Sequence, residues 1–235
     1  MKNESGSRRE QMEDLTKRQV RYLEAPTRKI IESLRELNLD QVYDAILSDD
    51  AGARIHSLLL WKIMKGMGKD DLQLFFVQGG AVLKNEHGEA VQQTKEYIQS
   101  ISKSLGCRVL IVTEEIMSGR SVSVLARALQ ENGITVDVAA FGLTHEFEAE
   151  GISEMERIQR ELPEHVTLIS GEAGSSAQLP EELTRLWHRN ESTNGRPMRK
   201  ITEETQIMGR AARDEVDKLA NKLTRELSQD SNIEN

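Results

Sequence analysis

The sequence predicts an α/β fold: a doubly wound, mostly parallel five-stranded sheet with added helices at both ends of the chain. Two observations predict it. Five short apolar segments rich in strand-forming residues recur along the chain, and amphipathic helical segments separate them. Apolar strands that alternate with amphipathic helices indicate a parallel sheet covered on both faces. The crossovers between the strands are then expected to be right-handed.

The expected strands cover residues 43–47, 72–77, 109–112, 135–143 and 166–170. Between them, apolar residues recur at intervals of three and four, which predicts helices over 55–67, 89–105, 122–131 and 153–162. Asn132 and Gly133 end the third of these helices, because both residues favour the end of a helix.

Further helices are expected outside the sheet. The polar residues 1–12 are expected to fray, and the helical material over 15–37 is interrupted at Ala25-Pro26. Residues 202–227 form one amphipathic run, expected to pack on the N-terminal helix or on a second copy of the chain as a homo-oligomer. The chain thus divides into an N-terminal helical extension (1–38), an α/β domain (39–180), and a basic linker with the C-terminal helix (181–235).

The composition is that of a soluble globular protein, with 37% hydrophobic residues, 30% charged residues and a formal net charge of −8. This charge argues against nucleic acid as a partner, because there is no basic surplus to neutralise phosphates. The single cysteine, Cys107, excludes an intrachain disulfide and favours a reducing compartment. No apolar run reaches the length of a membrane span, and no signal peptide is expected, because residues 1–20 are polar throughout. The cytoplasm is the expected location.

The segment 109–121 carries the most chemistry. An expected buried strand (109–112) is followed by two acids, Glu114 and Glu115, and then by a polar run, Ser118, Gly119, Arg120 and Ser121. A helix begins behind this run, and its first turn offers unpaired N–H groups and the positive end of the helix dipole. A Ser/Gly loop lets the backbone approach an anion closely, and the acids suit sugar hydroxyls or a divalent metal. The segment predicts a phosphate site beside a sugar site; an ordinary strand–helix connection is the alternative.

This pattern resembles the signature of the type I phosphoribosyltransferase family: an apolar strand, two acids, two variable residues, then Thr-Thr-Gly-Gly-Thr or a close variant. Aligned without gaps, the family's acids fall on Thr113 and Glu114, its Thr-Gly step on Ser118-Gly119, and its last threonine on Ser121. The resemblance implies that Thr113 and Glu114 contact the ribose hydroxyls of phosphoribosyl pyrophosphate and that residues 118–121 bind its 5′-phosphate. Thr113 in an acid position and Glu115 in an apolar position depart from the family pattern.

The loop after the first strand lies where this family binds pyrophosphate. The resemblance therefore implies pyrophosphate contacts from Gly52, Ala53 and Arg54. Asp49 and Asp50 would repel a diphosphate unless Mg²⁺ lies between them, which makes them the candidate metal ligands; the alternative is that both acids cap the following helix. His56, in the first turn of that helix, is either a ligand-facing base or a packing histidine.

A second loop, residues 78–88, contains Lys84. The resemblance implies that a flexible loop in this region closes over the reacting centre, with Lys84 as a phosphate contact. A plain connection between strand and helix is the alternative.

Three functions fit these residues. The first is an enzyme, a phosphoribosyltransferase that moves the 5-phosphoribosyl group from phosphoribosyl pyrophosphate, with Mg²⁺, to a nitrogen acceptor. Glu114 would hold the ribose hydroxyls, and Glu115 would act as an acid or base. The second is a catalytically inactive regulatory module that senses phosphoribosyl pyrophosphate or a nucleotide containing ribose 5-phosphate. The third is an oligomerising scaffold without a ligand.

Overall fold

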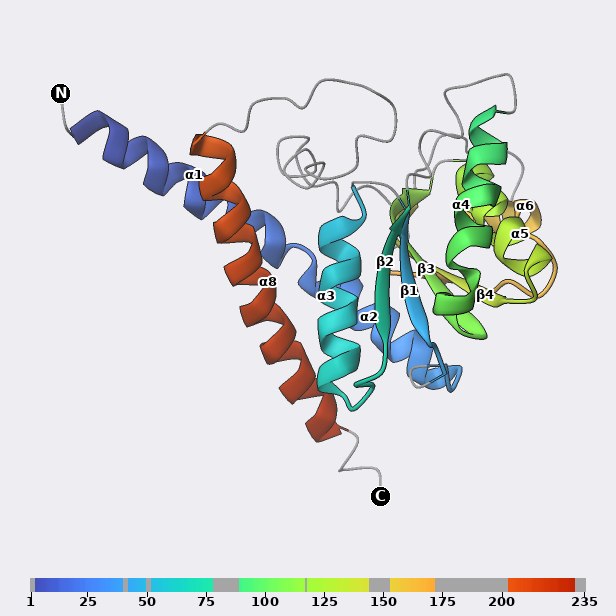
Figure 1. Cartoon of the computed structure of the whole chain (residues 1–235). Helices are drawn as coiled ribbons and strands as arrows, with labels where there is room; N and C mark the ends of the chain where they lie inside the picture. Colours follow the sequence, from blue (N-terminus) through green and yellow to red (C-terminus); the bar gives the residue numbers. More distant parts are fainter. Residues whose placement is uncertain are drawn as a thin grey trace.

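The computed structural model describes residues 3–39, 42–49, 52–77, 89–116, 118–143, 153–171 and 203–230. A five-stranded sheet lies at the centre (Figure 1). Its strands are β1 (Ala45–Asp49), β2 (Gln73–Val77), β3 (Arg108–Ile116), β4 (Thr135–Leu143) and β5 (Leu168–Ser170). They lie in the order β2-β1-β3-β4-β5, and each neighbouring pair is parallel. The expected α/β sheet is confirmed, and it is parallel throughout.

Helices cover both faces of this sheet, as buried parallel strands require. On one face lie α2 (Glu24–Glu36) and α3 (Arg54–Gly66) (Figure 1). On the other face lie α4 (Glu89–Leu105), α5 (Arg120–Glu131) and α6 (Glu154–Glu161). The fold is therefore doubly wound.

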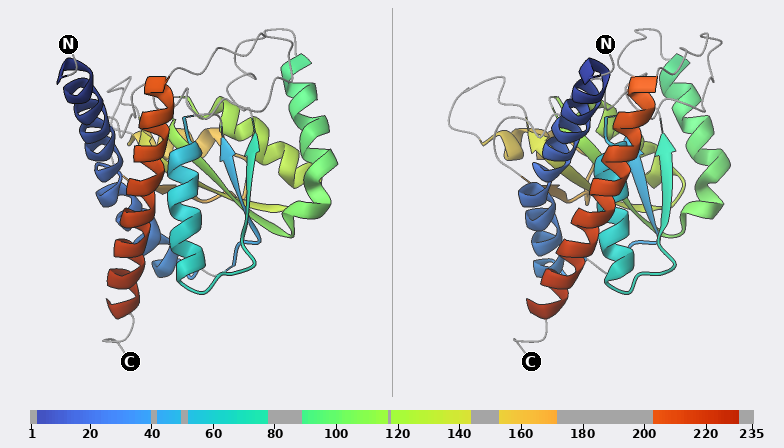
Figure 2. Two further views of the ribbon diagram at one scale, coloured as in Figure 1. Left: turned by 60° about the vertical axis from the view of Figure 1, so that its left-hand side comes forward. Right: turned by 90° about the vertical axis from the view of Figure 1, so that its left-hand side faces the viewer.

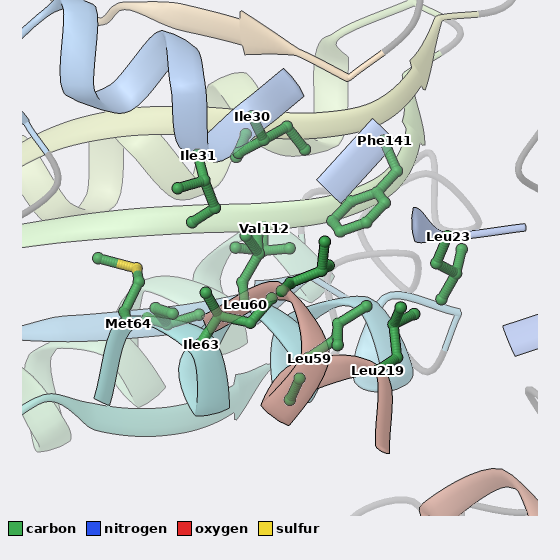
Figure 3. Close-up of a cluster of buried hydrophobic side chains, with 14 of the residues drawn as sticks. Leu23, Ile30, Ile31, Leu59, Leu60, Ile63, Met64, Val112, Phe141 and Leu219 are labelled. Carbon is green, nitrogen blue, oxygen red and sulfur yellow. The ribbon is translucent and has the colours of Figure 1, made fainter. Parts of the chain in front are cut away.

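Each face has its own apolar core. On the α2/α3 face, Ile31 and Ile63 gather with Val112 of β3 and Phe141 of β4 (Figure 3). The core on the other face contains Ile111 of the same strand, together with apolar residues of α4, α5 and α6. Side chains alternate between the two faces along a strand. Neighbouring residues of β3 therefore point into different cores, and the same alternation determines on which face of the sheet each of its two acids lies.

The helices from the two ends of the chain lie side by side. α1 (Asn3–Arg21) and α8 (Glu203–Asp230) pack against each other, and α8 also packs on α3 (Figure 2). The apolar stripe of α8 is buried in the core of the α2/α3 face. Its polar side forms ion pairs with the N-terminal helices, Arg21–Glu215 at 2.6 Å and Lys222–Glu24 at 2.5 Å. Within the chain, α8 thus packs on the N-terminal helix, which is one of the two expected alternatives.

The structure differs from the sequence expectation at several places. The first strand covers Ala45–Asp49 rather than 43–47, so Ser48 and Asp49 belong to the strand and not to the loop after it. Residues 3–12 are helical rather than frayed, because α1 packs on α8 and gains i,i+4 ion pairs such as Arg9–Glu13. The break between α1 and α2 comes before the proline, and Pro26 lies in the first turn of α2, where its missing N–H is tolerated. β3 continues to Ile116, so the two acids belong to the strand and not to the turn after it.

A buried polar group joins the strands at the amino edge of the sheet. Asp137 of β4 is 1% exposed. Its carboxylate accepts hydrogen bonds from the Tyr43 hydroxyl at 3.0 Å, from Arg108 Nη2 at 2.7 Å and from the Thr167 N–H at 3.1 Å. Burial of the phenol, together with this carboxylate, raises the pKa of Tyr43 above its usual value. This cluster lies at the opposite edge from the predicted ligand site.

Candidate functional site

The strand order creates a point of divergence between β1 and β3. After β1 the chain enters α3 on one face of the sheet, and after β3 it enters α5 on the other face. The two strands are hydrogen-bonded neighbours, with Ser48 opposite Val112. In open α/β sheets, ligands bind at such a point, outside the carboxyl ends of the strands. The two predicted segments, 49–54 and 113–121, therefore lie at one edge of the sheet.

Glu114 and Gly52 bring these segments into contact. A β-carbon built on Gly52 would lie 2.1 Å from Glu114 Oε2. The Glu114 carboxylate thus occupies the space that a side chain at position 52 would need, and glycine admits it. The sequence predicted both residues for the site; their contact required the three-dimensional structure.

The two acids of β3 point to different faces of the sheet. Glu114 lies on the α3 side, two residues after Val112, and strand alternation places Glu115 on the α5 side. Thr113 also falls on the α5 side, where it is 5% exposed and donates its hydroxyl to the carbonyl of Glu115 at 3.4 Å. The expected sugar-binding pair, Thr113 and Glu114, and the expected catalytic pair, Glu114 and Glu115, are therefore each divided between two faces. Of these acids and Thr113, Glu114 is the one beside Gly52.

The expected phosphate loop forms the start of α5. Gly119 is the N-cap residue, with a φ of 76° that favours glycine, and it makes no side-chain cap hydrogen bond. The Ser118 hydroxyl accepts the Arg120 N–H at 3.5 Å. Arg120 is exposed, and Ser118 and Ser121 are half-buried. Apart from this long contact of Ser118, the N-cap residue supplies no side-chain cap to the N–H groups in the first turn of α5.

One side of this loop packs on α6. A β-carbon on Gly119 would lie 3.5 Å from Ile158 Cγ2 and 3.6 Å from Glu161 Cβ. Ser123, in the next turn of α5, donates its hydroxyl to the Glu161 carbonyl at 2.9 Å. The packing of α6 therefore fixes where α5 begins relative to β3.

The loop after β1 leads directly into α3. This helix begins at Arg54, its N-cap is Ala53, and the cap makes no side-chain hydrogen bond. Asp49 is the last residue of β1 and is 6% exposed, and the N-cap residue of α3 is Ala53 rather than Asp49. Asp50 lies outside the described residues. The Arg54 guanidinium lies 5.0 Å from the centre of the Phe76 ring, a cation–π contact with β2.

His56 supports the backbone of this loop. It is 0% exposed, and its ring meets Phe141 edge-on with centroids 4.5 Å apart. Its Nδ1 lies 3.0 Å from the carbonyl oxygen of Gly52. Since a carbonyl only accepts, Nδ1 donates this hydrogen bond. These contacts favour the packing histidine over the ligand-facing base.

The candidate metal site is described only in part. Across the described segments, no group of three or more His, Cys, Asp or Glu residues is arranged to hold a metal ion. Mg²⁺ is commonly held by one or two carboxylates together with water and phosphate oxygens, and Glu114 fits that mode. Lys84 lies outside the described residues. A surface hollow of about 460 Å³, lined by residues that include Asp44 and Cys107, lies at the amino edge and contains none of the predicted site residues.

Among the residues that the structure describes, no helix combines the length and the apolar character needed to cross a membrane. No protein-family model and no curated protein matches the sequence. Among solved structures, the chain is similar to the phosphoheptose isomerase GmhA from Neisseria gonorrhoeae, with 10% identity, coverage of 92% of this chain and 95% of that chain, and a TM-score of 0.31. So low a TM-score supports no inference. The sheet itself defines a parallel, Rossmann-like α/β fold.

Proposed function

We propose that this chain binds a small molecule carrying a ribose 5-phosphate at the carboxyl edge between β1 and β3. The observation that carries the proposal is the contact of Glu114 with Gly52, because it joins the two segments that the sequence assigned to the ligand. Two helices without side-chain caps, α3 and α5, begin at the same edge. Helix N-termini suit a phosphate, and a carboxylate suits hydroxyl groups.

The phosphate would lie at the start of α5. The unpaired N–H groups of a first helical turn, with the helix dipole behind them, act as about half a positive charge. Ser118 and Ser121 add hydroxyl donors, and the exposed Arg120 adds a full charge. These groups together match a phosphate monoester.

The ribose would lie between this loop and α3. Glu114 projects from β3 on the α3 side as far as Gly52, and an ionised carboxylate accepts two hydroxyl groups at once. A ligand with its 5′-phosphate at α5 would thus have its ring hydroxyls toward Glu114.

The proposed reaction is transfer of the phosphoribosyl group from phosphoribosyl pyrophosphate to a nitrogen acceptor. Bond breaking at the anomeric carbon requires neutralisation of the departing diphosphate. Mg²⁺, when bound by Glu114 and ligand oxygens, would supply that positive charge. Gly52 and Ala53 would face the diphosphate with the start of α3. Arg54 would pair with it after leaving the Phe76 ring.

A second candidate function is that of a sensing module that binds the same ligand without turnover. Thr113 replaces the family's first acid, and its hydroxyl bonds to its own strand. Glu115 falls on the other face of the sheet. This arrangement supplies one acid of β3, Glu114, where the family's pattern has two.

Calorimetric titration with ribose 5-phosphate tests the binding. Ser121→Asp should lower the affinity by about tenfold or more, because it sets a negative charge in the first turn of α5, where the phosphate would lie. The matched control is Ser104→Asp, at an exposed position in the last turn of α4, which should leave the affinity unchanged. No binding by the unmodified chain, or an equal loss in both variants, would defeat the proposal.

Pyrophosphate release separates the two candidate functions. The chain is incubated with phosphoribosyl pyrophosphate, Mg²⁺ and a panel of purine and pyrimidine bases. Release that depends on one base supports transfer. Binding without release with any base supports the sensing module.

A further inference from the structure

His56 links the core of the protein to the loop that precedes α3. It lies in the first turn of α3 and is 0% exposed. Its ring meets Phe141 of β4 edge-on, with centroids 4.5 Å apart. Its Nδ1–H donates back along the helix to the Gly52 carbonyl at 3.0 Å. A side chain that is fixed in the core therefore holds the backbone of the loop.

Gly52 needs such an anchor because it is a glycine. A β-carbon at this position would lie 2.1 Å from Glu114 Oε2, so the close approach of the carboxylate requires the absence of a side chain. The same absence gives glycine more backbone freedom than any other residue has. The next residue, Ala53, is the N-cap of α3 and makes no side-chain cap hydrogen bond. The hydrogen bond from His56 restricts the freedom that the glycine introduces.

The position of the Glu114 carboxylate depends on both neighbouring elements. Its backbone is fixed by the pairing of β3 with β4. The end of its side chain lies against Gly52, whose carbonyl His56 holds. A group that binds a ligand must be held within about 0.5 Å of the productive geometry by the residues behind it. Because His56 is fully buried, it can act on a ligand only through such neighbours.

We propose that His56 is a positioning residue of the ribose site: its Nδ1–H holds the Gly52 carbonyl, and this fixes the point at which Glu114 accepts the hydroxyl groups of the ligand. The inference rests on the proposed function, which places those hydroxyls at Glu114. It assigns part of the affinity for the sugar to a buried residue of α3. The affinity for the phosphate at α5 does not depend on this residue.

Calorimetric titration with ribose 5-phosphate and 2-deoxyribose 5-phosphate tests this inference, because the two probes share the phosphate and differ in one hydroxyl. Both vicinal pairs of ring hydroxyls in ribose 5-phosphate include the 2-hydroxyl. A carboxylate that accepts two hydroxyls therefore loses one hydrogen bond in the deoxy probe. A hydrogen bond to a charged group is worth about tenfold in affinity, so the unmodified chain should prefer ribose 5-phosphate by about that factor.

Two complementary variants separate the hydrogen bond of His56 from its packing. His56→Phe keeps a ring against Phe141 and removes the donor, so the preference should fall to about twofold or less. His56→Asn keeps an amide N–H near the position of Nδ1 and removes the rest of the ring, so most of the preference should remain. His56→Leu is a second variant without a donor, for use if His56→Phe fails to fold. Circular dichroism confirms that each variant is folded.

The control for altered packing is Ile63→Val, two turns further along α3 and in the same core, which should leave the preference unchanged. An unchanged preference in His56→Phe or His56→Leu overturns the inference and leaves the proposed function standing. An equal loss in His56→Asn, or in Ile63→Val, assigns the effect to packing and also overturns it. Equal affinity of the unmodified chain for the two probes overturns the inference together with the placement of the ribose at Glu114. Binding of neither probe overturns the proposed function as well.

Discussion

Two carboxylates at the amino edge of the sheet, those of Asp44 and Asp137, stabilise the fold through hydrogen bonds to neighbouring segments. Asp44 accepts the N–H groups of Cys107 and Arg108 at 2.7 and 3.0 Å. Gly106, with a φ of 78°, leaves room for it, since a β-carbon there would lie 2.4 Å from Asp44. Asp137 is likewise surrounded by donors. A buried carboxylate is costly without such partners, so these residues fix how β1, β3 and β4 begin.

Tyr43 should make the stability of the fold decline at alkaline pH. Burial is the first cause of its raised pKa, and the charge and hydrogen bond of Asp137 add to it. In the unfolded chain the phenol ionises near its usual 10.0, whereas in the folded chain it keeps its proton. Its contribution to stability is therefore complete below that pH. Above that pH, ionisation of the phenol in the unfolded chain lowers the free energy of unfolding by up to about 1.4 kcal/mol per pH unit.

Urea unfolding of the unmodified chain and of Tyr43→Phe, from pH 8 to pH 11, isolates this effect from the other titrating groups. At pH 8 the variant should be less stable by about 1 kcal/mol, the net value of one hydrogen bond. The difference should narrow as the pH rises, because the phenylalanine has no proton to lose. A difference that stays constant up to pH 11 would contradict the assignment.

Among the elements, two were predicted with correct boundaries, whereas the first strand was predicted at 43–47 and covers Ala45–Asp49. α4 and β4 begin and end where the sequence places them, at 89–105 and 135–143. β3 was predicted too short, because Glu114 and Glu115 carry no apolar signal. Their strand conformation comes from pairing with β4, where Glu115 lies opposite Gly142. A local pattern contains no information about such a partner.

The candidate site was predictable only as separate segments. The preference of ligands for the carboxyl ends of parallel strands selects the two candidate loops from sequence alone. Glu114 and Glu115 point to opposite faces of the sheet because both belong to β3. A prediction that ends the strand at residue 112 does not assign either side chain to a face. The contact of Glu114 with Gly52 depends in addition on β1 and β3 being neighbours.

The outer edge of β2 is protected by two aromatic side chains. The Gln73 N–H donates to the backbone carbonyl of Asp44, which precedes β1, so the backbone groups of Leu72 and Phe76 face away from the sheet. The Trp61 Nε1 donates to the Leu72 carbonyl at 2.8 Å, and the Tyr97 hydroxyl donates to the Phe76 carbonyl at 3.2 Å. Exposed edge strands template association with other chains, and covering them prevents it.

Removing both donors should therefore promote self-association. In the double variant Trp61→Phe/Tyr97→Phe, two outward carbonyls lose their partners while the aromatic rings stay similar in shape. Sedimentation velocity over a concentration series should show an average mass that rises more steeply than in the unmodified chain. Tyr22→Phe, at a tyrosine that is 75% exposed between α1 and α2, serves as the control. Identical sedimentation of the double variant and the unmodified chain would refute the protective role.

For the molecule as a whole, the two ends of the chain complete a core that the α/β unit begins. Leu219 of α8 gathers with Leu59 of α3 and Leu23 before α2 (Figure 3). Residues of β3 and β4 belong to the same cluster. α8 thus buries its apolar stripe within the chain, over α3 and against α1. An extension that shares a core with the sheet should unfold together with it.

Substitutions in α8 and in the sheet should accordingly lower the urea midpoint of one common unfolding transition. Leu223 of α8 and Leu110 of β3 are both 0% exposed and belong to the same core. Each Leu→Ala substitution should destabilise by about 2–5 kcal/mol, and tryptophan fluorescence and circular dichroism should report one coincident urea transition. Asn221→Ala, on the exposed side of the same helix, should change stability by less than about 0.5 kcal/mol. The contrary result is a separate transition at low urea in Leu223→Ala, with the main transition, which Leu110→Ala lowers, unchanged. In that case α8 unfolds independently of the sheet, and the division of the chain at residue 181 is a thermodynamic boundary as well as a compositional one.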